Sequence, residues 1–138
     1  MMEVINVIAA AIAAFAFGAI WYMSMAKAWM AAAELHPDAK GRPAKPDAEE
    51  GSSSPAPYLI GLAAMLLVAG MMRHMFASSG ITTLGGGAVA GFGVGAFFIA
   101  PWVAMNYAFS LRKPALTVID GVNIVAGCTI IGLVLNAF

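Results

Sequence analysis

The residues that could do chemistry are few, and most of them stand beside aromatic side chains. The candidate set is Trp21, Tyr22, Trp102, Asn106, Tyr107, Asp120 and Asn123. Asp120 is the charged member, and it could form the centre of a polar pocket between the helix ends. The sequence offers no nucleophile beside a general base and no pair of carboxylates. We therefore predict that the protein is not an enzyme.

Metal and nucleotide sites are not indicated either. The two histidines, His36 and His74, fall in different loop regions, and the single cysteine, Cys128, does not complete a metal site. Residues 91–96 match the dinucleotide pattern G-x-G-x-x-A, but they lie inside an apolar segment with no strand before them. We predict no bound metal and no cofactor.

The composition indicates an integral membrane protein. The chain has 138 residues, of which 62% are hydrophobic and 10% are charged. Soluble domains contain about 45–50% apolar and about 25% charged residues. A formal net charge of zero gives no electrostatic basis for binding nucleic acid. The predicted surroundings are therefore a lipid bilayer, and nucleic acid is not a predicted partner.

Four apolar runs approach the roughly 20 residues that a helix needs to cross a bilayer. They cover residues 4–25, 58–75, 84–109 and 116–138. Residues 26–35 predict a short interfacial helix after the first span. Residues 36–57 are rich in proline, serine and charged side chains, which predicts a solvated linker without a core. The predicted fold is all-α, a single membrane domain over residues 1–138 built as a bundle of four transmembrane helices.

Small residues at every fourth position predict close helix packing in the membrane. In the third span they are Gly87, Gly91 and Gly95. In the first span they are Ala10, Ala14 and Gly18. We expect these two faces to pack against each other within one chain, and the alternative is packing against another subunit. Pro101 should kink the third span, because proline cannot donate a backbone hydrogen bond.

Lysine and arginine are distributed unevenly between the two sides of the predicted bundle. The first and third connections carry Lys27, Lys40, Arg42, Lys45, Arg112 and Lys113. The opposite side carries Arg73, which we expect to pair with Glu3. Because basic residues concentrate in cytoplasmic loops, the first and third connections are predicted to be cytoplasmic. Both termini are then non-cytoplasmic.

This orientation places the candidate set, together with Tyr58, near the cytoplasmic ends of the helices. One interpretation is a polar pocket between the helix ends, centred on Asp120. The other is an aromatic belt at the membrane surface, with Asp120 in the first turns of its helix and paired with Arg112 or Lys113. We favour the belt, because ionisable residues at the ends of spans are usually anchors.

Several segments together resemble a known family. The first half of the signature, G-x-x-W-Y and then K-x-W, is matched by Gly18, Trp21, Tyr22, Lys27 and Trp29. The second half is similar to residues 106–109, 112–114 and 119–121. This pattern resembles domain of unknown function family 1761, which comprises small bacterial membrane proteins. The chain departs from the expected pattern at Asp120 and Asn123, where asparagine and histidine are expected. The resemblance implies a multi-pass protein of the bacterial inner membrane and no particular activity.

Two functions agree with these observations. The first is a structural or accessory subunit that packs against a larger membrane complex or against itself as a homo-oligomer. The alternative is a small oligomeric transporter or channel, which usually needs a charge or a broken helix at mid-depth. Only Pro101 and the glycine run approach that requirement, so we favour the accessory subunit.

Overall fold

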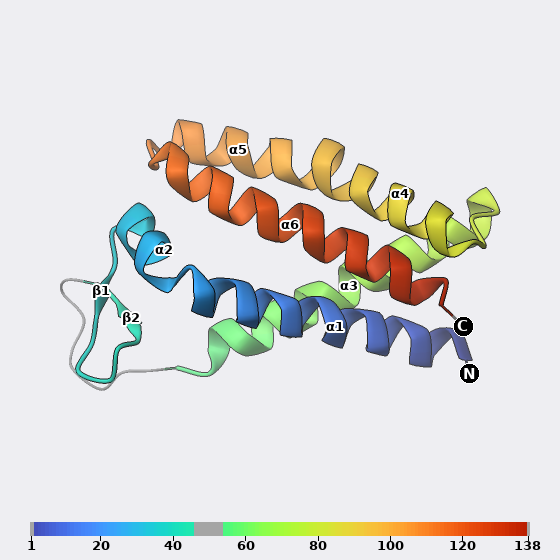
Figure 1. The fold of residues 1–138 in the computed structure, drawn as a ribbon, viewed down its shortest axis with the longest axis horizontal. Coiled ribbons are helices and arrows are strands. Elements are labelled where there is room, and N and C mark those ends of the chain that lie inside the picture. The colour runs from blue at the N-terminus through green and yellow to red at the C-terminus, as the bar shows by residue number, and fades with distance from the viewer. Residues whose placement is uncertain (1, 46–53, 138) are drawn as a thin grey trace.

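The computed structural model describes residues 2–45 and 54–137, and it is a bundle of long helices lying side by side (Figure 1). Its spans are α1 (Met2–Ser24), α3 (Ala56–Ser79), the continuous run of α4 (Leu84–Val94), η1 (Gly95–Ile99) and α5 (Ala100–Phe109), and α6 (Pro114–Leu135). Helix α2 (Ala26–Ala33) and a short hairpin of β1 (His36–Pro37) and β2 (Pro43–Ala44) lie between α1 and α3. Within these two described ranges, four helices are long and apolar enough to cross a membrane. The predicted all-α bundle with a short helix after the first span is confirmed.

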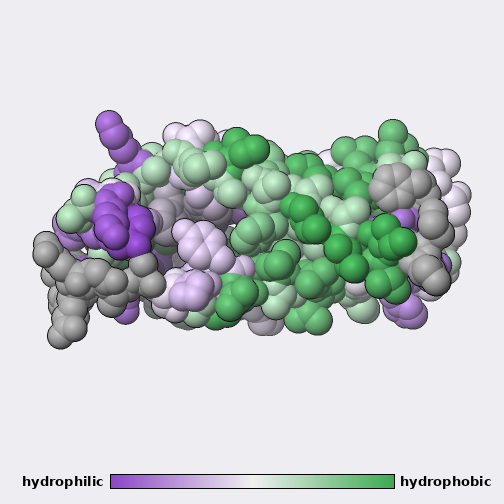
Figure 2. Space-filling view, turned by 90° about the horizontal axis from the view of Figure 1, so that it is seen from below, coloured by the Kyte–Doolittle hydropathy of each residue, from purple (hydrophilic) through white to green (hydrophobic). Residues whose placement is uncertain are grey.

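The two ends of the bundle differ in what they carry. The chain termini and the α3–α4 turn lie at one end, here called the termini end (Figure 1). Helix α2, the β1–β2 hairpin and the α5–α6 turn lie at the other, here called the hairpin end (Figure 1). Hydrophilic side chains gather towards both ends, and the surface between them is largely apolar on the face that Figure 2 shows. This distribution suits a lipid environment.

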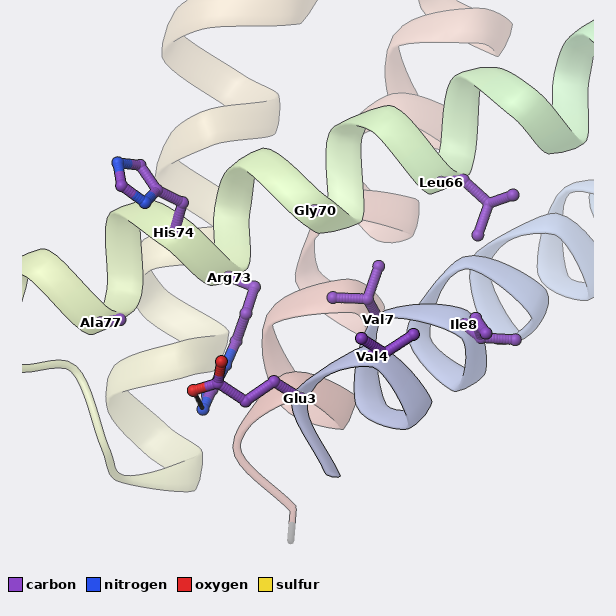
Figure 3. Close-up of a pocket in the computed structure, with 9 residues that line it drawn as sticks. All are labelled: Glu3, Val4, Val7, Ile8, Leu66, Gly70, Arg73, His74 and Ala77. Carbon is purple, nitrogen blue, oxygen red and sulfur yellow. Dashed lines mark hydrogen bonds and ion pairs between the residues drawn. The ribbon is translucent and has the colours of Figure 1, made fainter. Parts of the chain in front are cut away.

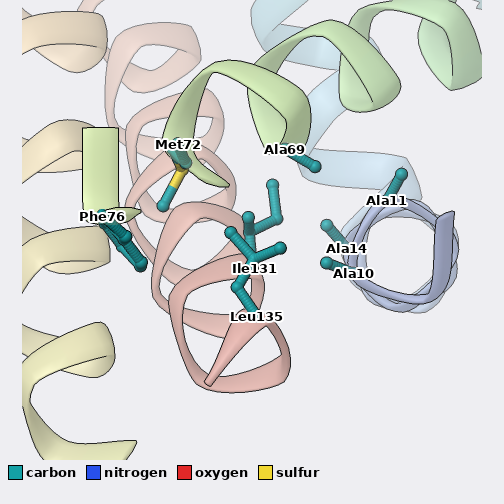
Figure 4. Packing of buried hydrophobic residues seen from close by; sticks show 8 residues of the cluster. All are labelled: Ala10, Ala11, Ala14, Ala69, Met72, Phe76, Ile131 and Leu135. Carbon is teal, nitrogen blue, oxygen red and sulfur yellow. The ribbon is translucent and has the colours of Figure 1, made fainter. Parts of the chain in front are cut away.

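Helix α6 is the central element of the bundle. It contacts α1, α3, α4 and α5, and a larger share of its residues is buried than in the third span. Small side chains of α1 meet larger ones of α3 and α6 in the main core (Figure 4). The buried members are Ala10, Ala11, Ala14, Ala69, Met72, Phe76, Ile131 and Leu135. The alanines let the helices approach, and the larger residues fill the space between them.

The glycines of the third span pack against α6, and the expectation that they pack against the first span is wrong. We call this contact the glycine seam. A Cβ at Gly87 would collide with the Gly132 carbonyl, and one at Gly91 would collide with the Cys128 carbonyl. A Cβ at Gly95 would lie 2.8 Å from Cα of Val125. The physical reason is that Gly132 also lacks a side chain, whereas the alanine face of α1 is already covered by α3 and α6.

The end of α3 lies further along the chain than predicted. The sequence predicts that the second span ends at Met75 and that a turn covers residues 76–83, but α3 continues to Ser79. Phe76 is 1% exposed within the main core, which keeps this turn of helix in the bundle. The helix ends where Gly80 adopts a left-handed conformation, with φ of 68°, and its N–H bonds to the Phe76 carbonyl. The turn is therefore shorter than predicted.

The irregularity expected at Pro101 takes the form of a π-helical turn. The five residues of η1 directly precede α5, and the N–H of Ala100 bonds to the carbonyl of Gly95. Such a turn accommodates a proline within a continuous span, because the backbone hydrogen bonds around it are shifted by one residue.

Part of the predicted linker is ordered. Residues 36–44 form the antiparallel hairpin, in which His36 pairs with Ala44 and Pro37 with Pro43. Asp38 closes the turn, since its carboxylate accepts hydrogen bonds from the backbone N–H groups of Lys40 and Arg42. Composition alone did not predict this local hydrogen bonding. Residues 46–53 of the linker lie outside the described residues.

Candidate functional site

A carboxylate bonded to two tyrosines lies at the hairpin end of the bundle. Three helices position it: α1 supplies Tyr22 near its end, α5 supplies Tyr107 near its end, and α6 supplies Asp120 near its beginning. These chain segments meet because successive spans run in opposite directions (Figure 1). Together the three side chains form what we call the tyrosine–aspartate cluster.

Each carboxylate oxygen of Asp120 has its own hydroxyl donor. The Tyr22 hydroxyl donates to Oδ1 at 2.8 Å, and the Tyr107 hydroxyl donates to Oδ2 at 2.7 Å. Asp120 is only 8% exposed. Hydrogen bonds to a charged group are short and strong, and they offset part of the cost of removing the carboxylate from water. The cluster therefore joins the first, third and fourth spans through one side chain.

The aromatic residues around the cluster are fixed by contacts with α6 and α2. The Trp21 indole Nε1 donates to the Ile119 carbonyl at 3.0 Å. The rings of Tyr22 and Trp29 meet edge to face, with centroids 5.4 Å apart. Helix α2 thus covers the cluster, over a second small core of Ala32, Ala33, Leu116 and Ile119.

The structure brings only part of the candidate set together. Four members lie close together. The hydroxyls of Tyr22 and Tyr107 bond to Asp120, and the Trp21 indole bonds to the carbonyl of the residue before Asp120. Asn123 lies one turn further along α6 and faces α1. A Cβ at Gly18 of α1 would lie 3.4 Å from Oδ1 of Asn123, so this side chain packs against α1.

The remaining members of the set lie apart from the cluster. Trp102 and Asn106 are exposed on α5, with Trp102 67% exposed. Tyr58 is 70% exposed at the beginning of α3. These three side chains belong to the outer surface at the hairpin end.

The ion pair expected in the belt interpretation is not formed. Among the described residues, neither Arg112 nor Lys113 forms an ion pair with Asp120. The Lys113 ammonium instead lies 3.7 Å from Glu34 and donates to the Ala31 carbonyl at 3.0 Å. The last carbonyls of a helix attract cations, so α2 provides an alternative partner for this lysine. The two tyrosines supply the donors that Asp120 requires without a buried cation.

The ion pair expected at the termini end is confirmed. Arg73 Nη2 donates to Glu3 Oε1 at 3.0 Å and thereby joins α3 to α1 (Figure 3). The Glu3 side chain is 70% exposed, so this pair contributes little to stability by itself.

Sequence reasoning missed two contributors to the site. The Ile119 carbonyl has no signal in the sequence, because every residue carries such a group. The cover provided by α2 had a signal, since Ala32 and Ala33 follow Trp29 at the spacing that extends one helix face. Through its hydrogen bonds, the tyrosine–aspartate cluster can hold the buried Asp120 carboxylate in place and fix the relative rotation of three helices.

Comparison with known proteins identifies the family and leaves its activity open. Among curated proteins and solved structures, no match to the chain was found. The profile of DUF1761, described as a protein of unknown function, matches residues 5–136. This match covers all four spans and both halves of the signature noted in the sequence. The chain therefore belongs to the DUF1761 family of proteins of unknown function.

Proposed function

We propose that the chain is a non-enzymatic structural or accessory membrane subunit, which packs against other membrane-protein subunits or a second copy of itself. The observation that carries the proposal is the outer surface of the third span. Its large exposed aromatic side chains are Phe92, Phe97, Phe98, Trp102 and Phe109. Within the described chain, none of the residues of α5 is buried. Aromatic side chains of this size dominate the energetics of many protein interfaces.

The interior of the bundle supports a structural role. Both oxygens of Asp120 accept hydrogen bonds from tyrosines of the same chain, so the carboxylate joins helices. The glycine seam places the backbones of α4 and α6 in direct contact. Both features favour a rigid scaffold whose outer surface is available to a partner.

Co-purification in mild detergent tests this proposal. Phe98→Ala and Trp102→Ala should lose the subunits, or the second copy, that accompany the wild-type chain. Leu67→Ala is the matched control, because Leu67 is 76% exposed on α3 and lies on a different span. The proposal would be wrong if the wild-type chain purified as a lone monomer, or if all three variants retained the same partners.

We also propose that the chain lies in the inner membrane of a bacterium, with the hairpin end in the cytoplasm and both termini on the opposite side. The support is the position of the basic residues. Those at the hairpin end are Lys27, Lys40, Arg42, Lys45, Arg112 and Lys113, whereas Arg73 lies at the termini end.

Cysteine labelling in intact cells tests the orientation. Lys40 is exposed in the hairpin turn and Thr82 is exposed in the α3–α4 turn, so each accepts a cysteine without loss of a core contact. A membrane-impermeant maleimide should label Thr82→Cys and spare Lys40→Cys until the cells are opened. The reverse pattern would overturn the proposed orientation.

The alternative, a small oligomeric transporter or channel, has one observation in its favour. The π-helical turn Gly95–Ile99 interrupts the third span well inside its length, and irregular helices of this kind occur at functional sites. Reconstituted vesicles distinguish the two functions. Proton-coupled flux that Asp120→Asn abolishes would favour transport, whereas an accessory subunit should show no flux and should keep its partners in this variant.

A further inference from the structure

A groove between α1 and α3 opens at the termini end, far from the tyrosine–aspartate cluster. Its volume is about 460 Å³. Apolar side chains of both helices, among them Val7, Ile8 and Leu66, form its walls, and Gly70 leaves space between them (Figure 3). The Glu3–Arg73 ion pair lies at one end of the groove, beside the beginning of α1 (Figure 3). We call this feature the headgroup groove.

We propose that the headgroup groove binds one zwitterionic phospholipid with a primary ammonium group, that is, a phosphatidylethanolamine. The Arg73 guanidinium binds the lipid phosphate, the Glu3 carboxylate binds the ammonium, and one acyl chain lies over Val7, Ile8 and Leu66. Opposite charges at neighbouring positions match the opposite charges of this headgroup. The proposal is independent of the accessory-subunit function, because it concerns a different surface of the chain.

One donor of the Arg73 guanidinium is buried without a partner in the described part of the chain. Arg73 donates from Nη2 to Glu3, and its Nε has no hydrogen-bond partner among the described residues. A guanidinium carries five N–H groups and binds phosphate oxygens in a planar, bidentate geometry. Rotation of the side chain towards a phosphate would therefore satisfy Nε and keep the Glu3 contact within reach.

The depth of the charged pair suits a lipid headgroup. Glu3 lies in the first turn of α1, and Arg73 lies in the last third of α3, so both belong to the termini end of the bundle. A long arginine side chain extends from within a span to the interface. With its side chain 70% exposed, Glu3 remains accessible to an ammonium from the lipid.

The shape below the charged pair suits an acyl chain. A Cβ at Gly70 would meet only Val7, at 4.0 Å, so the space in front of this glycine is not filled by the protein. Val4 and Ile8 remain exposed along the groove. An acyl chain in this space would contact both helices, whereas one on a smooth helix surface would contact a single helix.

Native mass spectrometry of the full chain tests the proposal. The protein is purified in detergent and mixed with equal amounts of phosphatidylethanolamine, phosphatidylcholine and phosphatidylglycerol that share the same acyl chains. Phosphatidylethanolamine should be retained over phosphatidylcholine by on the order of tenfold, because only its ammonium can donate hydrogen bonds to Glu3. Equal retention of these two lipids would overturn the proposal. Preferential retention of phosphatidylglycerol would also overturn it, since that result would indicate a site for anionic lipid on Arg73 alone.

Variants identify the parts of the groove. Glu3→Gln should lower phosphatidylethanolamine retention to the level of phosphatidylcholine, and Arg73→Gln should weaken retention of all three lipids. Gly70→Leu should fill the groove and release lipid, whereas Gly93→Leu is a matched control, because a Cβ at Gly93 meets no atom within 4 Å. An unchanged preference in Glu3→Gln would refute the assignment of the ammonium site. If a variant fails to fold, the relative retention of the three lipids by the wild-type chain still tests the proposal.

Discussion

The glycine seam and the tyrosine–aspartate cluster attach the same helix, α6, to its neighbours by different physical means. The seam consists of backbone against backbone, and a Cβ at Gly87 or Gly91 would collide with carbonyl groups of α6. The cluster consists of two hydrogen bonds from tyrosine hydroxyls to one carboxylate. Lipid chains are as apolar as leucine, so helices in a membrane associate through close contact or hydrogen bonds. This bundle uses close contact along the third span and hydrogen bonds at the hairpin end.

The difference predicts how each region responds to mutation. The seam tolerates no added atom, because the obstacle is backbone that cannot rotate away. The cluster tolerates changes of shape but requires its donors, because an unpaired buried carboxylate is costly. Substitutions can therefore separate the two regions.

The largest expected effect is in the glycine seam. Gly91→Leu should destabilise the bundle by about 3 kcal/mol or more, since the helices must separate and lose many dispersion contacts together. Unfolding in mixed micelles measures the change. The matched control is Gly93→Leu, where a Cβ meets no atom within 4 Å, and removal of a helical glycine there should be neutral or stabilising by up to about 1 kcal/mol. Similar losses of stability in both variants would show that close contact at the glycine seam does not stabilise the bundle.

A smaller effect is expected in the tyrosine–aspartate cluster. Tyr22→Phe and Tyr107→Phe should each destabilise the bundle by about 1.5–3 kcal/mol, because each removes one donor from the carboxylate and leaves the ring in place. Tyr58→Phe is the control, since Tyr58 is 70% exposed, and its change should stay within about 0.5 kcal/mol. Equal stabilities for all three variants would contradict the account of the cluster.

The sequence predicted the spans because apolar runs of membrane length have few other interpretations. It did not predict the partner of the glycine seam. Small residues repeat at every fourth position in both α1 and the third span. Such a pattern identifies a packing face but does not indicate which helix packs against it. A signal was present in α6, where Cys128 and Gly132 repeat the same spacing. The end of α3 was missed for a related reason, because the burial of Phe76 depends on helices distant in the sequence.

The sequence placed three members of the candidate set at the same end of the bundle, but it did not predict which side chains bond to Asp120. Residue types and span directions were enough to place Tyr22, Tyr107 and Asp120 at one end of the bundle. Whether Asp120 meets a tyrosine or a lysine depends on the rotation of each helix about its axis. Single-sequence patterns do not report that rotation.

The smallest expected effect concerns Asp38 in the hairpin, whose side chain is 16% exposed. Hydrogen bonds from the Arg42 backbone N–H and side chain lower the pKa of Asp38 below its ordinary value of 3.8. A carboxyl whose pKa falls on folding stabilises the folded hairpin fully above the ordinary value, and this contribution is lost as the pH falls through the lowered pKa. Carbon NMR titration of Asp38 should show the lowered pKa, and Arg42→Gln should raise it part of the way. A titration at the ordinary value would contradict the observed turn.

Solid-state NMR of the labelled chain in lipid bilayers can detect the close approach of the two helices at the glycine seam. We expect cross-peaks between the backbone carbon atoms of Gly91 and Gly132, because a Cβ at Gly132 would lie 3.2 Å from Cα of Gly91. Cross-peaks from Gly91 to Ala10 or Ala14 of α1, with none to Gly132, would contradict it.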